Sequence, residues 1–304
     1  MDPLIVFSGF GIGLLVGMTG MGGASLMTPI LILFFGTAPT TAIGTDIFYG
    51  AITKTVGGWR HFKAGTVHRG IAFWLAVGSV PAAIGGVFLI EYLQRAYGED
   101  QLEQLVLGMV GGALLVVGVA TLLRAFFLSK HIPERYAMHL YPRHIAAAVI
   151  TGVVTGFVIG LTSAGSGTLI GISLIMIFRL TPQRVVGTDV FHAAVLLWAA
   201  GVAHWIGGNV DFGLAGNILL GSIPGVLIGT KLAVRAPHAV LRPALGLVLV
   251  AAAITLLAKE GWPQDVVIPA VVVATVIVGG LLAMQVAQAR SHARRKREAA
   301  AALG

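Results

Sequence analysis

Two segments rich in glycine and hydroxyl residues, 17–25 and 160–168, interrupt long apolar stretches of the sequence. Irregular backbone at membrane depth is stable only where protein or a water-filled cavity surrounds it, so the two breaks indicate a polar site near the middle of a membrane. The short helix after each break would aim N–H groups and the positive end of its dipole at this site, which favours an anion. The residues predicted to bind the anion are Thr19, Gly20, Gly22, Gly23, Ser25, Thr162, Ser163, Gly165, Ser166, Gly167 and Thr168.

The two breaks belong to an internal repeat, because the second half of the sequence matches the first at a constant offset of 143 residues. The register holds without a gap over residues 9–89 and aligns the Gly-Thr-Asp sequence ending at Asp46 with the one ending at Asp189. Such duplication is typical of secondary transporters. A different explanation of the glycines is that they only permit close helix packing, as in the pair Gly13 and Gly17. That explanation fits poorly with dense clusters at equivalent points of both halves.

Asp46 and Asp189 are the carboxylates, among twelve Asp and Glu residues, that lie well inside apolar segments. An ionisable group in a membrane is a functional candidate, and burial favours the neutral form of a carboxyl group. Either Asp could therefore bind a proton in one conformation and release it in another, which would couple transport to protons. Equally, each could hold its helix to a neighbouring break through hydrogen bonds. Tyr49 and His192 follow one turn later and are predicted to join coupling or gating.

Three further basic residues, Lys54, His61 and His204, lie in or near the apolar segments. Lys54 lies eight residues after Asp46 on the same helix face, so it could supply a cation to an anion pathway or extend its ammonium group to the membrane surface. His61 and His204 fall near opposite membrane faces, where we expect them to be interfacial residues at helix ends. This separation excludes a metal site between them.

The composition requires a membrane protein built from helices. Of 304 residues 57% are apolar and 11% are charged, whereas about 25% are charged in soluble domains. The repeated apolar runs are far too long for barrel strands, so the predicted fold class is an all-α polytopic membrane protein. The net charge of +8 comes partly from a basic tail, for which we expect contact with lipid headgroups and no nucleic acid.

Enzymatic and metal-binding signatures are missing from the sequence. It contains no cysteine, which excludes disulfides, thiolate nucleophiles and cysteine metal sites. There is no HExxH motif, and Ala164 stands where a GxSG serine motif needs glycine before Ser166. We therefore predict no enzyme activity, no cofactor and no metal.

Each half is predicted to contain a broken helical hairpin followed by long transmembrane helices. The first repeat covers 1–128, with a hairpin at 4–35 and helices at 42–59, 70–90 and 102–124. A cytoplasmic linker at 129–143 leads to the second repeat at 144–288, with a hairpin at 144–178 and helices at 185–205, 212–231, 243–258 and 266–288. The basic cytoplasmic tail covers 289–304.

The basic residues select one membrane topology. If each hairpin enters and leaves on one side, 17 of the 20 Lys and Arg residues face that side, in the connections 60–69, 124–143, 179–184 and 231–242 and the segment 290–297. If each broken segment crossed once, the split would be 8 against 11. The positive-inside rule therefore places the N-terminus outside and the C-terminus in the cytoplasm, and the two halves are inverted.

Several motifs resemble the TauE/SafE sulfite exporter family, also called the toluene sulfonate uptake permease family. They are the segment Gly17–Pro29 and its copy at 160–169, the segment Ala42–Asp46, and the segment Gly65–His68. The resemblance covers nearly the whole chain and implies an anion transporter, since members move sulfite, sulfoacetate, other organosulfonates or thiosulfate. Family sequences often have Gly-Thr-Ser where this chain has Gly-Thr-Asp, which leaves room for proton coupling. Relatives that import thiosulfate depend on cysteines along the path, so thiosulfate is disfavoured here.

These observations predict an inner-membrane carrier that exports a small sulfur-containing oxyanion, such as sulfite or the organosulfonate sulfoacetate, by alternating access. Its partners would be the small anion, protons as the candidate coupling ion, and membrane lipid. An uptake permease or a carboxylate carrier of the same fold is the alternative within transport. The alternative from another class is a membrane scaffold that transports nothing, which would need no polar centre.

Overall fold

The computed structural model describes residues 3–19, 24–128, 140–233 and 238–259, and the regular elements of this part are all helices. The predicted all-α polytopic membrane fold is confirmed. In chain order the elements are α1 (Pro3–Thr19), α2 (Ala24–Phe34), α3 (Pro39–Lys63), α4 (Arg69–Ala96), α5 (Glu99–Leu123), the π-helical turn η1 (Arg124–Leu128), α6 (Pro142–Thr162), α7 (Leu169–Met176), α8 (Pro182–Ile206), α9 (Phe212–Ala233) and α10 (His238–Lys259).

The outer surface of these helices is apolar, as expected for a protein in a membrane. The helical ranges Arg69–Ala96, Gln101–Phe126, Pro142–Thr162, Pro182–Ile206 and Phe212–Gly229 are long and apolar enough to cross a membrane. Large apolar side chains face outward along them, for example Phe73, Phe88 and Trp205, each more than half exposed. A surface so rich in exposed apolar groups suits contact with lipid rather than with water.

Equivalent helices in the two halves have a glycine after their ends and the same capping hydrogen bonds at their starts. The helix ends of α3 and α8 are followed by Gly65 and Gly208, which have left-handed backbone conformations with φ values of +68° and +74°. At the start of the next helix, the ring of His68 and the carboxylate of Asp211 each accept a hydrogen bond from the backbone N–H three residues further on. Each pair of residues is separated by 143 positions, so the repeat in sequence is also a repeat in local structure.

Most helices extend beyond the apolar ranges read from the sequence. Helix α3 covers Pro39–Lys63 where the apolar run suggested 42–59, and α10 begins at His238 rather than at 243. Backbone hydrogen bonding continues into the polar ends of a helix, which a search for apolar runs does not detect. The predicted helix at 266–288, most of the linker at 129–143 and the tail at 289–304 lie outside the described residues.

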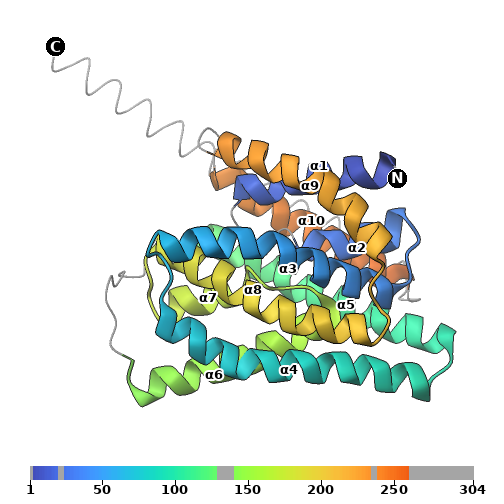
Figure 1. Cartoon of the computed structure of the whole chain (residues 1–304), viewed down its shortest axis with the longest axis horizontal. Helices are drawn as coiled ribbons and strands as arrows, with labels where there is room; N and C mark the ends of the chain where they lie inside the picture. Colours follow the sequence, from blue (N-terminus) through green and yellow to red (C-terminus); the bar gives the residue numbers. More distant parts are fainter. Residues whose placement is uncertain (1–2, 20–23, 129–139, 234–237, 260–304) are drawn as a thin grey trace, which may run out of the picture.

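The two halves interlock helix by helix. Helix α1 packs against α9, and their counterparts in the other half, α6 and α4, pack against each other. The central pair α3 and α8 lies between these outer pairs, as Figure 1 shows, with α3 contacting α9 and α8 contacting α4. Helices α5 and α10 form a further pair. Each pair therefore joins one helix from each half.

Glycines allow the close approach of the outer pairs. A Cβ atom at Gly156 of α6 would overlap the carbonyl oxygen of Ser79 in α4, and one at Gly13 of α1 would overlap that of Ser222 in α9. Gly156 is the repeat-mate of Gly13, and Ser222 is the repeat-mate of Ser79, so the two contacts are equivalent under the repeat. For these glycines, which lie outside the breaks, the packing explanation is therefore correct.

Replacing Gly156 with alanine is expected to destabilise the protein by about 1–3 kcal/mol, because the added methyl group forces α4 and α6 apart. Gly216→Ala in α9 is the matched control, since no atom lies within 4 Å of its new Cβ position. Thermal unfolding of both variants in detergent measures the difference. Equal stability of the two variants would contradict the packing role of Gly156.

Candidate functional site

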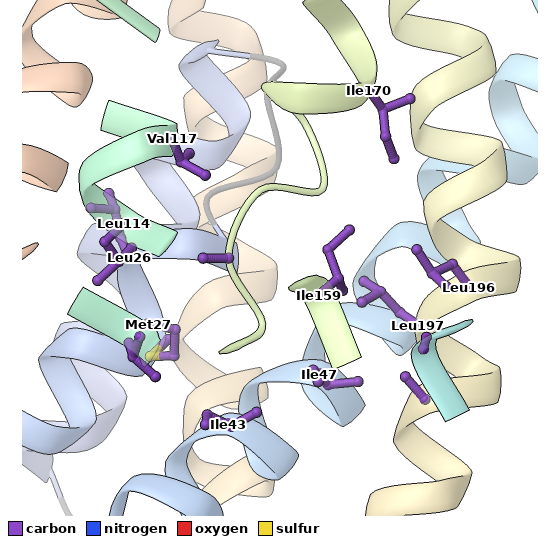
Figure 2. Packing of buried hydrophobic residues seen from close by; sticks show 14 of the residues in the cluster. Leu26, Met27, Ile43, Ile47, Leu114, Val117, Ile159, Ile170, Leu196 and Leu197 are labelled. Carbon is purple, nitrogen blue, oxygen red and sulfur yellow. The ribbon is translucent and has the colours of Figure 1, made fainter. Parts of the chain in front are cut away.

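The second break is a segment of bends and turns in the interior of the protein. It connects α6 with α7, and Figure 2 shows it surrounded by buried apolar side chains, among them Leu114 and Val117 of α5, Ile159 of α6 and Leu197 of α8. The backbone of the break is irregular, with φ values of +60° at Ser163 and +106° at Gly165. Because apolar groups enclose this segment, its polar groups depend on protein partners.

The first and second breaks come into contact at Ser25. The backbone N–H of Gly165 donates a hydrogen bond of 3.1 Å to the Ser25 hydroxyl, near the start of α2. Thr162 accepts a hydrogen bond of 3.3 Å from Ala164 N and donates one of 2.7 Å to a carbonyl of its own helix. Thr19 is the last residue of α1. The predicted residues Gly20, Gly22 and Gly23 lie outside the described residues.

Asp46 joins three helices through one carboxylate oxygen. Its Oδ2 atom accepts hydrogen bonds from Thr28 N at 3.2 Å, from Thr28 Oγ1 at 2.6 Å and from Ser163 Oγ at 2.8 Å. Thr28 belongs to α2 and Ser163 ends α6, so Asp46 holds both hairpins to α3. This geometry supports the structural explanation of Asp46. Thr28 was not among the predicted site residues, because a threonine inside a short apolar helix gives no distinctive signal.

Lys54 points into the protein rather than toward a membrane surface. The side chain is 6% exposed, and its Nζ atom donates a hydrogen bond of 3.0 Å to Ser166 Oγ in the second break. The explanation in which Lys54 reaches the membrane surface is therefore wrong, because the packing of α3 against the second break leaves the ammonium group inside. Asp46 and Asp189 both lie within electrostatic range of this ammonium group.

Asp189 has a different environment from its repeat-mate Asp46. It is 3% exposed, and in the described part of the chain its Oδ1 atom, like that of Asp46, has no hydrogen-bond partner. Its compensating charges are Lys54 and Arg124. A buried ionisable side chain of this kind is a candidate for a functional role.

Arg124 is the site residue that the sequence analysis missed. It was counted among the cytoplasmic basic residues, but its side chain is 6% exposed and donates a hydrogen bond of 3.3 Å from Nη1 to the carbonyl of Gly167. One turn earlier, Thr121 shares a hydrogen bond of 3.0 Å with Thr168. The position of Arg124 directly after an apolar run suggested a helix end at the membrane surface. In the structure, the π-helical turn η1 continues α5, and Arg124 lies inside the protein.

The gating candidates Tyr49 and His192 are buried at equivalent positions of α3 and α8. His192 Nε2 forms a hydrogen bond of 2.8 Å with Ser79 Oγ in α4. His204 is fully buried and its Nε2 atom lies 3.0 Å from the Gly160 carbonyl. His204 lies in the last turn of α8, as predicted for a helix-end residue, but its ring is enclosed by protein and contacts α6.

The centre thus collects two acidic and two basic side chains, each at most 6% exposed: Asp46, Asp189, Lys54 and Arg124. When all four are ionised their charges cancel, which reduces the cost of burying them together. Within the described residues no cluster of three acidic or histidine side chains could hold a metal ion. Such a centre is a candidate for anion binding and proton exchange.

An apolar helical bundle of this kind defines an integral membrane protein, and its charged, buried centre is the candidate functional site. The family model described as sulfite exporter TauE/SafE matches residues 5–256. The chain therefore belongs to the TauE/SafE family of membrane transporters.

Two proteins of Bacillus subtilis and one of Xylella fastidiosa illustrate the similarity, and all three are named probable membrane transporter proteins. YjnA is 40% identical over 235 residues, which cover 77% of this chain and 91% of YjnA. YdhB is 30% identical over 255 residues, covering 84% and 99% of the two chains. The Xylella protein is 28% identical over 259 residues, covering 83% and 94%. No solved structure matches the chain significantly.

Proposed function

We propose that this protein exports a small sulfur-containing oxyanion, such as sulfite or sulfoacetate, across the inner membrane and uses protons as the coupling ion. The observation that carries the proposal is the buried ammonium group of Lys54 on Ser166 in the second break. A buried cation next to a hydroxyl group offers a binding point for an anion that has lost its water.

The arrangement of the halves supports alternating access. The repeat relates the α1–α9 pair to the α6–α4 pair. In the central pair, the two repeat-mates α3 and α8 pack against each other. Two halves related in this way can exchange conformations, so that the centre opens first to one side and then to the other. In this proposal, the buried centre corresponds to a closed state of the alternating-access cycle.

A membrane scaffold is less consistent with the same centre. Burial of four ionisable side chains is costly in a membrane, and a protein without a transported ion would gain nothing from retaining them. The direction of flux distinguishes uptake from export. The selectivity of flux distinguishes a carboxylate carrier from a carrier of sulfur oxyanions.

Flux into and out of proteoliposomes containing the full chain tests the proposal. Sulfite, sulfoacetate and sulfate are supplied with and without a pH gradient, and a short carboxylate is included for comparison. We expect flux of sulfite or sulfoacetate that a pH gradient accelerates. Flux of the carboxylate alone would support the carboxylate carrier, and no flux of any anion would favour the scaffold.

The orientation of the halves makes a separate prediction. The connection with Lys63 is expected in the cytoplasm and the connection with Asp211 outside, because the basic residues are concentrated on the first side. Both residues are exposed, whereas the neighbouring Asn209 is 5% exposed and unsuitable for labelling. Lys63→Cys and Asp211→Cys introduced into the cysteine-free chain should react with an impermeant thiol reagent from opposite sides. Reaction of both from one side would refute inverted halves.

A further inference from the structure

Arg124 occupies a space that one glycine of the second half leaves open. A Cβ atom at Gly171 in α7 would lie 2.5 Å from Arg124 Nη1 and 3.2 Å from Cζ, so any side chain there would displace the guanidinium group. The repeat-mate of Gly171 is Thr28, whose hydroxyl binds Asp46 in the first half. Glycine at this position of α7 therefore leaves room for the guanidinium group of Arg124.

The two buried cations bind consecutive residues of the same break. Lys54 donates to the hydroxyl of Ser166, and Arg124 donates to the carbonyl of Gly167. Both acceptors are neutral, and a hydrogen bond from an ammonium or guanidinium group is stronger when its acceptor is an anion. The repeat-mate of Lys54 is Leu197, so Lys54 has no basic counterpart in the other half. The positive charge of the centre is therefore concentrated at the second break.

We propose that Arg124 and Lys54 together bind the anionic group of the substrate at the second break and select a group with three oxygens over a carboxylate. The inference rests on the proposed function and names the binding residues and the substrate class. A guanidinium group matches two oxygens in one plane, and the ammonium group takes a third oxygen from another direction. Sulfite and sulfonates have this non-planar arrangement. A carboxylate has two oxygens in one plane, so it can bind the guanidinium group but offers no third oxygen to Lys54.

Binding of radiolabelled sulfite to the purified full-length protein, with methanesulfonate and acetate as competitors, tests this proposal. We expect methanesulfonate to compete at least about tenfold better than acetate in the wild type, as the third oxygen adds a charge-assisted hydrogen bond. Arg124→Lys keeps the charge but loses the planar pair of donors, so sulfite affinity should fall about tenfold or more and the preference for methanesulfonate should shrink.

Gly171→Ala provides a second variant that keeps every charge and only displaces the guanidinium group, so it should show the same losses. Gly112→Ala in α5 is its control, because no atom lies within 4 Å of that Cβ position, and it should bind as the wild type. Unfolding temperatures identify the folded variants, and Gly171→Ala decides the question if Arg124→Lys does not fold. Wild-type sulfite affinity and selectivity in the folded variants would overturn the role of Arg124 while leaving the proposed function intact. Failure of the wild type to bind sulfite or methanesulfonate would instead overturn the proposed function, and this inference with it.

Discussion

Replacing Lys54 with methionine is expected to reduce anion flux at least about 100-fold, because it removes a buried cation from the candidate binding centre. The side chain is 6% exposed, and its ammonium group contacts Ser166 and faces both Asp46 and Asp189. Methionine has similar length and flexibility, so the substitution removes the charge with little change in volume. Flux of radiolabelled sulfite in proteoliposomes measures the effect.

The repeat supplies a matched control for this prediction. Leu197 is the repeat-mate of Lys54 in α8 and is fully buried, and Leu197→Met conserves volume at the equivalent position. We expect Leu197→Met to transport as the wild type, and Lys54→Arg, which keeps the charge, to retain more flux than Lys54→Met. Undiminished flux in a folded Lys54→Met protein would remove Lys54 from the anion pathway.

The helical framework could be predicted from the sequence because it depends on features that repeat. Long apolar runs define membrane helices, and the constant offset of 143 residues connects equivalent positions such as Gly13 and Gly156. The structure places these two glycines in equivalent contacts, against Ser222 and Ser79. A periodic or repeated pattern is determined locally, so it remains visible without knowledge of the tertiary contacts.

The side-chain partners of the centre could not be predicted in the same way. Lys54 and Arg124 both lie near the ends of apolar runs, where a basic residue more often reaches toward the membrane surface. Only the packing of α3 and η1 against the second break decides that both point inward. His204 shows the same effect, since it lies in the last turn of α8 and is nevertheless buried, with its ring against the Gly160 carbonyl of α6.

The two repeat-mates Asp46 and Asp189 illustrate where sequence symmetry ends. In sequence they are equivalent, and structural and functional roles were equally supported for both. In the structure, hydroxyl and N–H groups of Thr28 and Ser163 donate hydrogen bonds to one oxygen of Asp46, its Oδ2 atom. Glycine stands at the position equivalent to Thr28, so Asp189 depends on the charges of Lys54 and Arg124 instead. The asymmetry therefore leads us to expect different roles for the two residues.

Asp189→Asn is expected to abolish the pH dependence of anion flux while retaining anion binding. The charged groups facing Asp189 are Lys54 from α3 and Arg124 from η1, and His192 on its own helix also faces Lys54. At low pH a protonated Asp189 leaves the two positive charges available for the anion. As pH rises, the ionised carboxylate neutralises these charges and repels the anion, so binding weakens. Asparagine mimics the protonated state at every pH, which keeps binding strong and removes the switch.

Asp46→Asn is expected to behave differently, because the amide oxygen can still accept the hydrogen bonds from Thr28 and Ser163. We expect pH-dependent flux to remain, with stability lower by about 1–3 kcal/mol as charge-assisted bonds become neutral ones. Sulfite binding and flux across a pH range from 5 to 8, measured together with unfolding temperature for both single variants, separate the two roles. Retained pH-dependent flux in Asp189→Asn would exclude this carboxylate from proton coupling, and loss of pH dependence in Asp46→Asn alone would transfer that role to Asp46.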